Sequence, residues 1–77
     1  MALKAYVLIQ AGPGKSREIA KQMKKINGVK SVAVVTGPHD VIAFIEIKDS
    51  KTLGDLLIKK VQKIDGIAAT LTDVVID

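Results

Sequence analysis

The feature that most constrains this fold is a set of four short segments that are apolar at nearly every position. A strand covered on one side only alternates apolar and polar residues, because successive side chains point to opposite faces. These segments hardly alternate and are rich in Val, Ile, Leu and Ala at both parities. They predict four strands with two apolar faces each, over residues 3–10, 29–36, 41–47 and 67–76.

Two segments with helical periodicity separate these strands. The first has a predicted N-cap at Ser16, a stop at Asn27-Gly28 and a buried stripe of Ile19, Ala20, Met23 and Ile26. The second starts from a cap at Asp49 or Ser50, stops at Asp65-Gly66 and has a stripe of Leu53, Leu56, Leu57, Val61 and Ile64. The predicted order is therefore βαββαβ.

The two halves of the chain repeat each other. KINGVKSVAV at residues 25–34 matches KIDGIAATLT at residues 63–72, an offset of 38 residues. In each copy a helix ends, turns on a Gly and leads into a strand. Two such units predict a ferredoxin-like α+β fold, in which a four-stranded antiparallel sheet carries both helices on one face. We expect residues 1–77 to form a single domain.

The second sheet face needs a cover of its own. Two helices cover only one face, and monomers rarely expose an apolar patch beyond a few hundred Å². Because the chain has no Cys for a disulfide, self-association is the expected route to stability for so small a domain. We predict a face-to-face homodimer, that is, a dimeric α/β barrel. The interface would hold Tyr6, Leu8, Ala33, Val35, Ile42, Phe44, Val74 and Ile76.

Composition argues against several kinds of partner. The net charge of +4 comes from lysines that mix with acidic residues on the helices, so we expect solvated faces and no direct DNA binding. Tyr6 and Phe44 are the only aromatic residues, too few for a sheet that stacks RNA bases. The longest apolar run, 41–45, is too short to cross a membrane. We expect a cytoplasmic protein that needs no metal or cofactor, since one His and no Cys do not make a zinc site.

Three motifs could carry chemistry. GPGKS at residues 12–16 follows a strand and precedes a helix, but Ile9 stands where a phosphate-binding loop needs Gly, so we favour a plain turn. His39 beside Asp40 in the TGPHD loop could be turn chemistry, a ligand contact or, less favoured, a catalytic pair. Thr70 and Thr72 share one strand face and are either strand residues or hydroxyls of a small-molecule site.

These segments together resemble a known family. AYVLIQ, KINGV, VVTGPHDVIAFIEI and KIDGIAATLTDVVI look like the effector domain of Lrp/AsnC-type transcription regulators, also called the RAM domain. The resemblance covers nearly the whole chain. It implies the fold above, dimers joined through their sheets and assembled into larger rings, and a free amino acid bound near the interface between dimers.

The resemblance also implies site residues by position. Asp40 would pair with the α-ammonium of the amino acid, and backbone N–H groups around Gly37 and His39 would bind its carboxylate. His39 departs from the family, in which an aromatic residue such as Tyr is common before the Asp. The predicted ligand-binding residues are Thr36, Gly37, His39, Asp40, Thr70 and Thr72, and none is expected to be catalytic.

Strand one starts at residue 3, so we expect a stand-alone effector domain without a helix-turn-helix. It would sense an amino acid or co-assemble with a full-length Lrp/AsnC regulator. Three alternatives stay open. An ACT-like regulatory domain is kept open by Gly12 and Gly14 after strand one, and a ligand-free assembly domain fits the same pattern. A small dimeric α+β barrel enzyme is less favoured, because the interior assigned to Tyr6, Phe44, Thr70 and Thr72 has no well-placed base.

Overall fold

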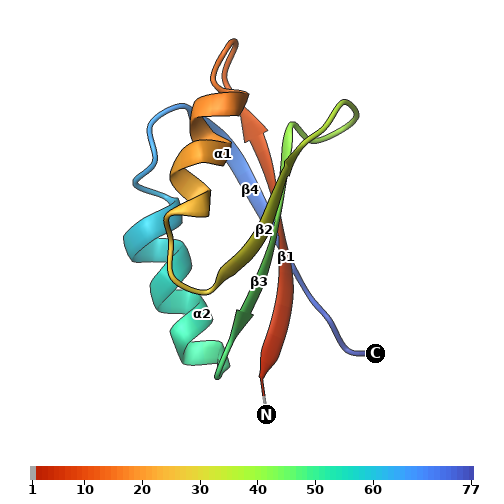
Figure 1. The fold of residues 1–77 in the computed structure, drawn as a ribbon, viewed down its shortest axis with the longest axis vertical. Coiled ribbons are helices and arrows are strands. Elements are labelled where there is room, and N and C mark those ends of the chain that lie inside the picture. The colour runs from red at the N-terminus through yellow and green to blue at the C-terminus, as the bar shows by residue number, and fades with distance from the viewer. Residues whose placement is uncertain (1) are drawn as a thin grey trace.

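The computed structural model describes residues 2–77 and confirms the ferredoxin-like order of elements (Figure 1). These are β1 (Leu3–Ala11), α1 (Ser16–Lys24), β2 (Val29–Val34), β3 (Val41–Ile47), α2 (Ser50–Leu56), the π-helical segment η1 (Leu57–Val61) and β4 (Ile67–Val74). The strands lie in the order β2-β3-β1-β4, and every neighbouring pair is antiparallel. Both helices cover the same face of the sheet (Figure 1).

The core lies between that face and the helices. In the two central strands every second side chain faces the helices, and six of these are 0% exposed: Ala5, Val7, Ile9, Val41, Ala43 and Ile45. Ile19 and Met23 of α1 and Val61 of η1 are equally buried against them. Removal of this apolar area from water is what holds the two layers together.

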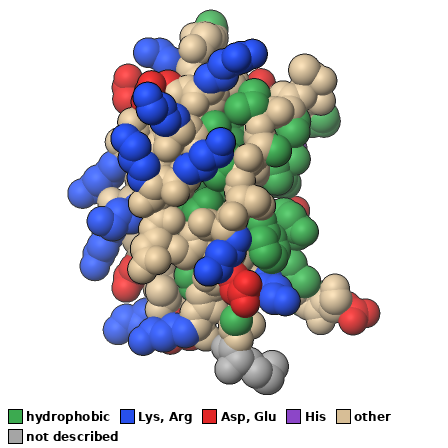
Figure 2. All heavy atoms as spheres, in the orientation of Figure 1, with side chains coloured by type: hydrophobic (Ala, Val, Ile, Leu, Met, Phe, Trp, Pro, Cys, Tyr) green, Lys and Arg blue, Asp and Glu red, His purple; other side chains and the backbone are tan. Residues whose placement is uncertain are grey.

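The opposite face of the sheet is bare. Tyr6 pairs with Phe44 across β1 and β3, and their ring centroids lie 5.0 Å apart. Leu8 pairs with Ile42 on one side and with Leu71 on the other, so all three share this face. Tyr6 remains 44% exposed and Leu71 59% exposed. Figure 2 shows the resulting apolar surface on the side of the molecule away from the helices.

Strand β4 presents its faces the other way round from our prediction. Thr70 pairs with Ile9, Thr72 with Val7 and Val74 with Ala5, and all three partners point into the core. Because directly paired residues share a face, Thr70, Thr72 and Val74 lie on the helix side, and Leu71 lies on the open face. The prediction was wrong because alternation shows which residues of a strand share a face, but not which face that is.

The end of the last strand also differs from the prediction. β4 ends at Val74, and one further backbone hydrogen bond, from Val75 N–H to the Lys4 carbonyl, holds the tail at 2.8 Å. Ile76 lies beyond that bond and is 97% exposed. The open face in this structure therefore includes Tyr6, Leu8, Ala33, Ile42 and Phe44 of the predicted interface, and it gains Leu71.

The helix ends show one success and two differences. Asp49 caps α2 as predicted, because its carboxylate accepts the Thr52 N–H at 2.8 Å. The N-cap of α1 is Lys15 rather than Ser16, and it makes no side-chain cap hydrogen bond. The second helix widens into η1, where Gln62 N–H donates to the Leu57 carbonyl five residues back, at 2.9 Å. No sequence signal predicted that π-helical turn.

Candidate functional site

The TGPHD segment forms a loop between β2 and β3. Strand β2 ends at Val34, two residues earlier than predicted, and Val35 N–H then donates to the Asp40 carbonyl at 2.9 Å. Gly37 has φ 150, and nothing lies within 4 Å of where its Cβ would be. Thr36 and Gly37 are exposed, so the tip of the loop faces solvent.

Asp40 fastens this loop to the end of β1. The pairing of β1 with β3 ends at Ile9 and Val41, although β1 continues to Ala11. Beyond the last pair, Asp40 N–H donates to the Ile9 carbonyl at 2.9 Å, and Asp40 Oδ2 accepts the Ala11 N–H at 2.8 Å. The Asp40 carboxylate therefore satisfies the Ala11 N–H, which lies beyond the last residue pair of β1 and β3.

Next to this attachment lies a hollow of about 250 Å³, lined by Leu8, Gln10, His39, Ala69, Thr70 and Leu71. Leu8 pairs with Leu71 and Gln10 with Ala69, so its floor is the open face of β1 and β4. The Gln10 amide donates to the Pro38 carbonyl at 3.2 Å and so links the floor to the loop. His39 is half-buried, and its Nδ1 is enclosed without a hydrogen-bond partner among residues 2–77.

The structure brings together only part of the predicted ligand site. His39 lines the hollow, and Thr70, 31 positions later, borders it from a strand position whose side chain faces the helix side, while Asp40 holds the loop beside it. Thr36, Gly37 and Thr72 are not among its lining residues. The sequence analysis missed Gln10, Ala69 and Leu71, because their place depends on how β4 pairs with β1. A register shift at Gln10 and Ala11 interrupts that pairing.

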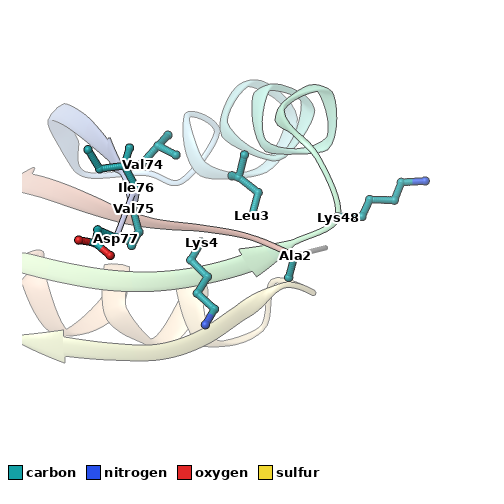
Figure 3. A pocket seen from close by; sticks show the side chains of 8 residues that line it. All are labelled: Ala2, Leu3, Lys4, Lys48, Val74, Val75, Ile76 and Asp77. Atoms are coloured by element: carbon teal, nitrogen blue, oxygen red, sulfur yellow. The ribbon is translucent and has the colours of Figure 1, made fainter.

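A larger hollow of about 480 Å³ lies at the opposite end of the sheet, between the start of β1 and the C-terminal tail. Ligand sites need a few polar groups that converge on one point. Figure 3 shows the Lys4 and Lys48 side chains directed apart, with Val74 of β4 and Val75 and Ile76 of the tail lying away from Lys48. Its groups do not converge, so the hairpin end is the better candidate.

The hairpin hollow is not built for acid–base catalysis. His39 is the one titratable side chain in its lining, and no nucleophile–base pair forms there. The carboxyl groups with lowered pKa lie elsewhere: Glu18 accepts a hydrogen bond from Gln22, and Asp49 accepts one from Thr52, which lowers the pKa of each. Residues 2–77 contain no group of three or more His, Cys, Asp or Glu side chains that could hold a metal ion.

Residues 4–77 match the family model described as the Lrp/AsnC ligand binding domain. The chain belongs to that family. Its domain is regulatory and non-enzymatic, so the ACT-like and enzyme alternatives are set aside. Residues 2–77 of this Lrp/AsnC domain include no helix-turn-helix, and none of their helices is long and apolar enough to span a membrane.

Relatives and solved structures agree with this assignment. An HTH-type transcriptional regulator of Pyrococcus abyssi is 33% identical over 70 residues, which are 91% of this chain and 44% of that protein. The hypothetical protein PHS023 of Pyrococcus horikoshii is 30% identical with a TM-score of 0.90, over 99% of this chain and 90% of that one. The transcriptional regulator NMB0573 of Neisseria meningitidis, solved as an L-Met complex, is 18% identical with a TM-score of 0.87, over 97% and 50%. The chain thus spans about half the length of the curated relatives it matches.

Proposed function

We propose that this Lrp/AsnC domain binds a free amino acid at the hairpin end of its sheet and acts as the effector-binding and assembly module of a transcription regulator. The observation that carries the proposal is the hollow in which His39 of the loop faces the open-face residues of β1 and β4. The Neisseria regulator, which shares the fold, was solved as an L-Met complex and supports the class of ligand.

The chemistry of the loop suits a zwitterion. Asp40 Oδ2 is engaged with Ala11, which leaves the second carboxylate oxygen to accept a hydrogen bond from an α-ammonium group. Backbone N–H groups of Gly37 and His39 would bind the carboxylate. Leu8, Ala69 and Leu71 offer an apolar wall to the side chain of the ligand. Thr36, Gly37 and Thr72 lie outside the hollow, so a role for them requires walls supplied by a neighbouring subunit.

We also propose that the open face joins two copies into a homodimer. An apolar sheet face with Tyr6 44% and Leu71 59% exposed is costly to leave in water, and a second copy offers a matching surface under twofold symmetry. Dimers would assemble further into a ring and complete the effector site between them. A full-length Lrp/AsnC regulator, with which the domain would share the cytoplasm, could replace the second copy.

Calorimetric titration of the extensively dialysed protein with each of the twenty amino acids tests the effector proposal. Heat of binding from one or a few amino acids is expected and would name the effector. If none of the twenty amino acids gives heat of binding, the proposal is contradicted and the ligand-free assembly alternative is favoured.

Asp40→Asn sharpens the test, because the amide oxygen can still accept the Ala11 N–H while the negative charge is lost. We expect this variant to fold and assemble normally but to bind the effector at least tenfold more weakly. Asp55→Asn, on the exposed surface of α2, is the matched control and should bind normally. Equal affinity in the Asp40→Asn variant and the control would remove the Asp40 charge from the site.

A further inference from the structure

The charges of this protein are divided between its two layers. Residues 15–25 and 50–65, which contain the helices, hold nine of the twelve basic residues and three of the eight acidic ones. That layer therefore carries a net charge of +6, whereas the rest of the chain carries −2. Figure 2 shows Lys and Arg gathered on the helix side of the molecule, away from the apolar face.

Little within the molecule neutralises this basic surface. All nine basic side chains are exposed: Lys15, Arg17, Lys21, Lys24, Lys25, Lys51, Lys59, Lys60 and Lys63. The one ion pair within 4.0 Å in residues 2–77 joins Lys15 to Asp65, at 3.9 Å and on largely exposed side chains. Along α1, Arg17, Lys21 and Lys24 follow one another at spacings of four and three, where like charges repel. Glu18 interacts favourably with Lys15, Lys21 and Lys25, but the layer keeps a net positive charge, which suits an anionic partner.

The surface is also shaped to receive a partner. The lining of a hollow of about 400 Å³ between the helices includes three lysines and two acidic residues, namely Lys15, Lys60, Lys63, Glu18 and Asp65. A second hollow of about 390 Å³, beside it, is lined by Lys25, Lys59 and Lys60. Asp55 also lines the second hollow, and Lys60 belongs to both, so the two hollows adjoin and together hold five lysines and three carboxylates.

We infer that this helix surface binds the phosphate backbone of duplex nucleic acid without reading its sequence. An acidic protein fits less well, because lysine is depleted at protein–protein interfaces, whereas interfaces with DNA are polar and strongly basic. Lysines act as point charges toward phosphates, and eight of the nine basic residues here are lysines. Both aromatic side chains lie in the sheet, so none is available to stack on bases.

This inference goes beyond amino-acid binding and changes one expectation. The mixed charges of the helices suggested no direct contact with DNA, but the structure places the basic residues on one layer. In a dimer joined through the open face, the helix layers would point outward on both sides. Each dimer would then present two basic surfaces, which suits a module that holds a nearby duplex while another domain reads the sequence.

Fluorescence anisotropy with a labelled 30-base-pair duplex of arbitrary sequence, at 50 and at 200 mM salt, tests the inference on the unmodified protein. We expect dissociation constants on the order of 1–100 µM at the lower salt and a steep loss of affinity at the higher one. Two duplexes of unrelated sequence should bind equally well. Failure to bind at 50 mM salt would overturn the inference.

A pair of double variants separates the helix surface from net charge. Lys60→Gln/Lys63→Gln removes two charges from the inter-helix hollow, and Lys30→Gln/Lys48→Gln removes two from a hollow at the sheet side. The first should weaken binding about tenfold at 50 mM salt and reduce the slope of log affinity against log salt by about 2. The second should change affinity less than about twofold.

Equal losses in the two double variants would overturn the inference, because binding would then follow net charge alone. Displacement of the duplex by poly-glutamate at equal charge concentration would overturn it too, in favour of an acidic polypeptide. Circular dichroism and sedimentation of both variants check that the substitutions leave the fold and assembly unchanged.

Discussion

The two faces of the sheet consist of the same kinds of residue, but one face is buried under the helices and the other is exposed. On the helix-covered face, Val7, Ile9 and Ile45 are 0% exposed, whereas on the open face Tyr6 is 44% and Leu71 59% exposed. Residues of the two faces alternate along the same strands and are equally apolar, so the local sequence does not show which face becomes buried. The difference teaches that covering one face stabilises the domain, while the bare face is the one to which we assign the proposed association and ligand binding.

The largest expected effect comes from the covered face. Ile9→Ala removes a fully buried side chain at the centre of the core, which should lower the free energy of unfolding by about 2–5 kcal/mol. Leu71→Ala on the open face should change the stability of one subunit by only about 0.5 kcal/mol or less. Urea denaturation of both variants, each also carrying Phe44→Glu to keep the subunit monomeric, measures both. A similar loss in the two variants would contradict the division between faces.

A charged side chain introduced on the open face should prevent association of the subunits without unfolding the domain. Phe44→Glu places a carboxylate beside Tyr6, where a dimer would have to bury it without a partner. We expect sedimentation to show a folded 8.2 kDa species for this variant and a larger one for the unmodified protein. Gln62→Glu, exposed on the helix layer, is the control and should stay assembled. A folded monomer of the unmodified protein at micromolar concentration would refute the dimer proposal.

The turns that flank the covered face should tolerate substitution less well than an open turn. Gly28 has φ 101, and a Cβ there would lie 2.9 Å from Ile47 Cγ2. Gly14 has φ 74, with nothing within 4 Å. The left-handed conformation costs each Ala variant about 1–2 kcal/mol, and crowding adds to this cost in Gly28→Ala alone. The melting temperature of Gly28→Ala should therefore be lower than that of Gly14→Ala. The reverse order would show that Ile47 moves aside freely.

The smallest effect concerns the exposed cap of the covering helix. Hydrogen bonding to the side chain and the N–H of Thr52 lowers the pKa of Asp49 below 3.8, its ordinary value. Its stabilisation is therefore fully present above about pH 4 and is lost as the pH falls through the lowered pKa. Asp49→Ala should lower the melting temperature slightly at pH 7 and not at pH 2. An equal difference at both pH values would show that the carboxylate charge is not the cause.

The pattern of residues predicted the elements and their order well. Helical stripes such as Ile19 and Met23, the turns at Gly28 and Gly66, and β-branched runs are local signals, and they led to the correct βαββαβ order. β3 was predicted from Val41 to Ile47 and has those bounds. The repeat at an offset of 38 residues predicted the pairing of two similar halves, because each half must bury the same helix stripe.

The site was harder to predict than the fold. The TGPHD motif predicted a turn between two strands, which the structure confirms, but the bond from its Asp40 to Ala11, 29 residues away in the chain, was not predicted. The floor of the hollow includes Gln10, Ala69 and Leu71, whose positions follow from the β1–β4 pairing and its register shift. No local rule sets such a register when both parities of a strand are apolar.

The sequence by itself determined the family, the βαββαβ order and the presence of more apolar strand surface than two helices can cover. These properties follow from the spacing of residues that are close together in the sequence, and that spacing does not depend on how distant segments pack. Only the tertiary structure decided which face of β4 points outward, that Asp40 fastens the loop to β1, and that the basic residues gather on one layer. Those outcomes depend on strand register and on which element packs against which, and residues far apart in the chain set them together.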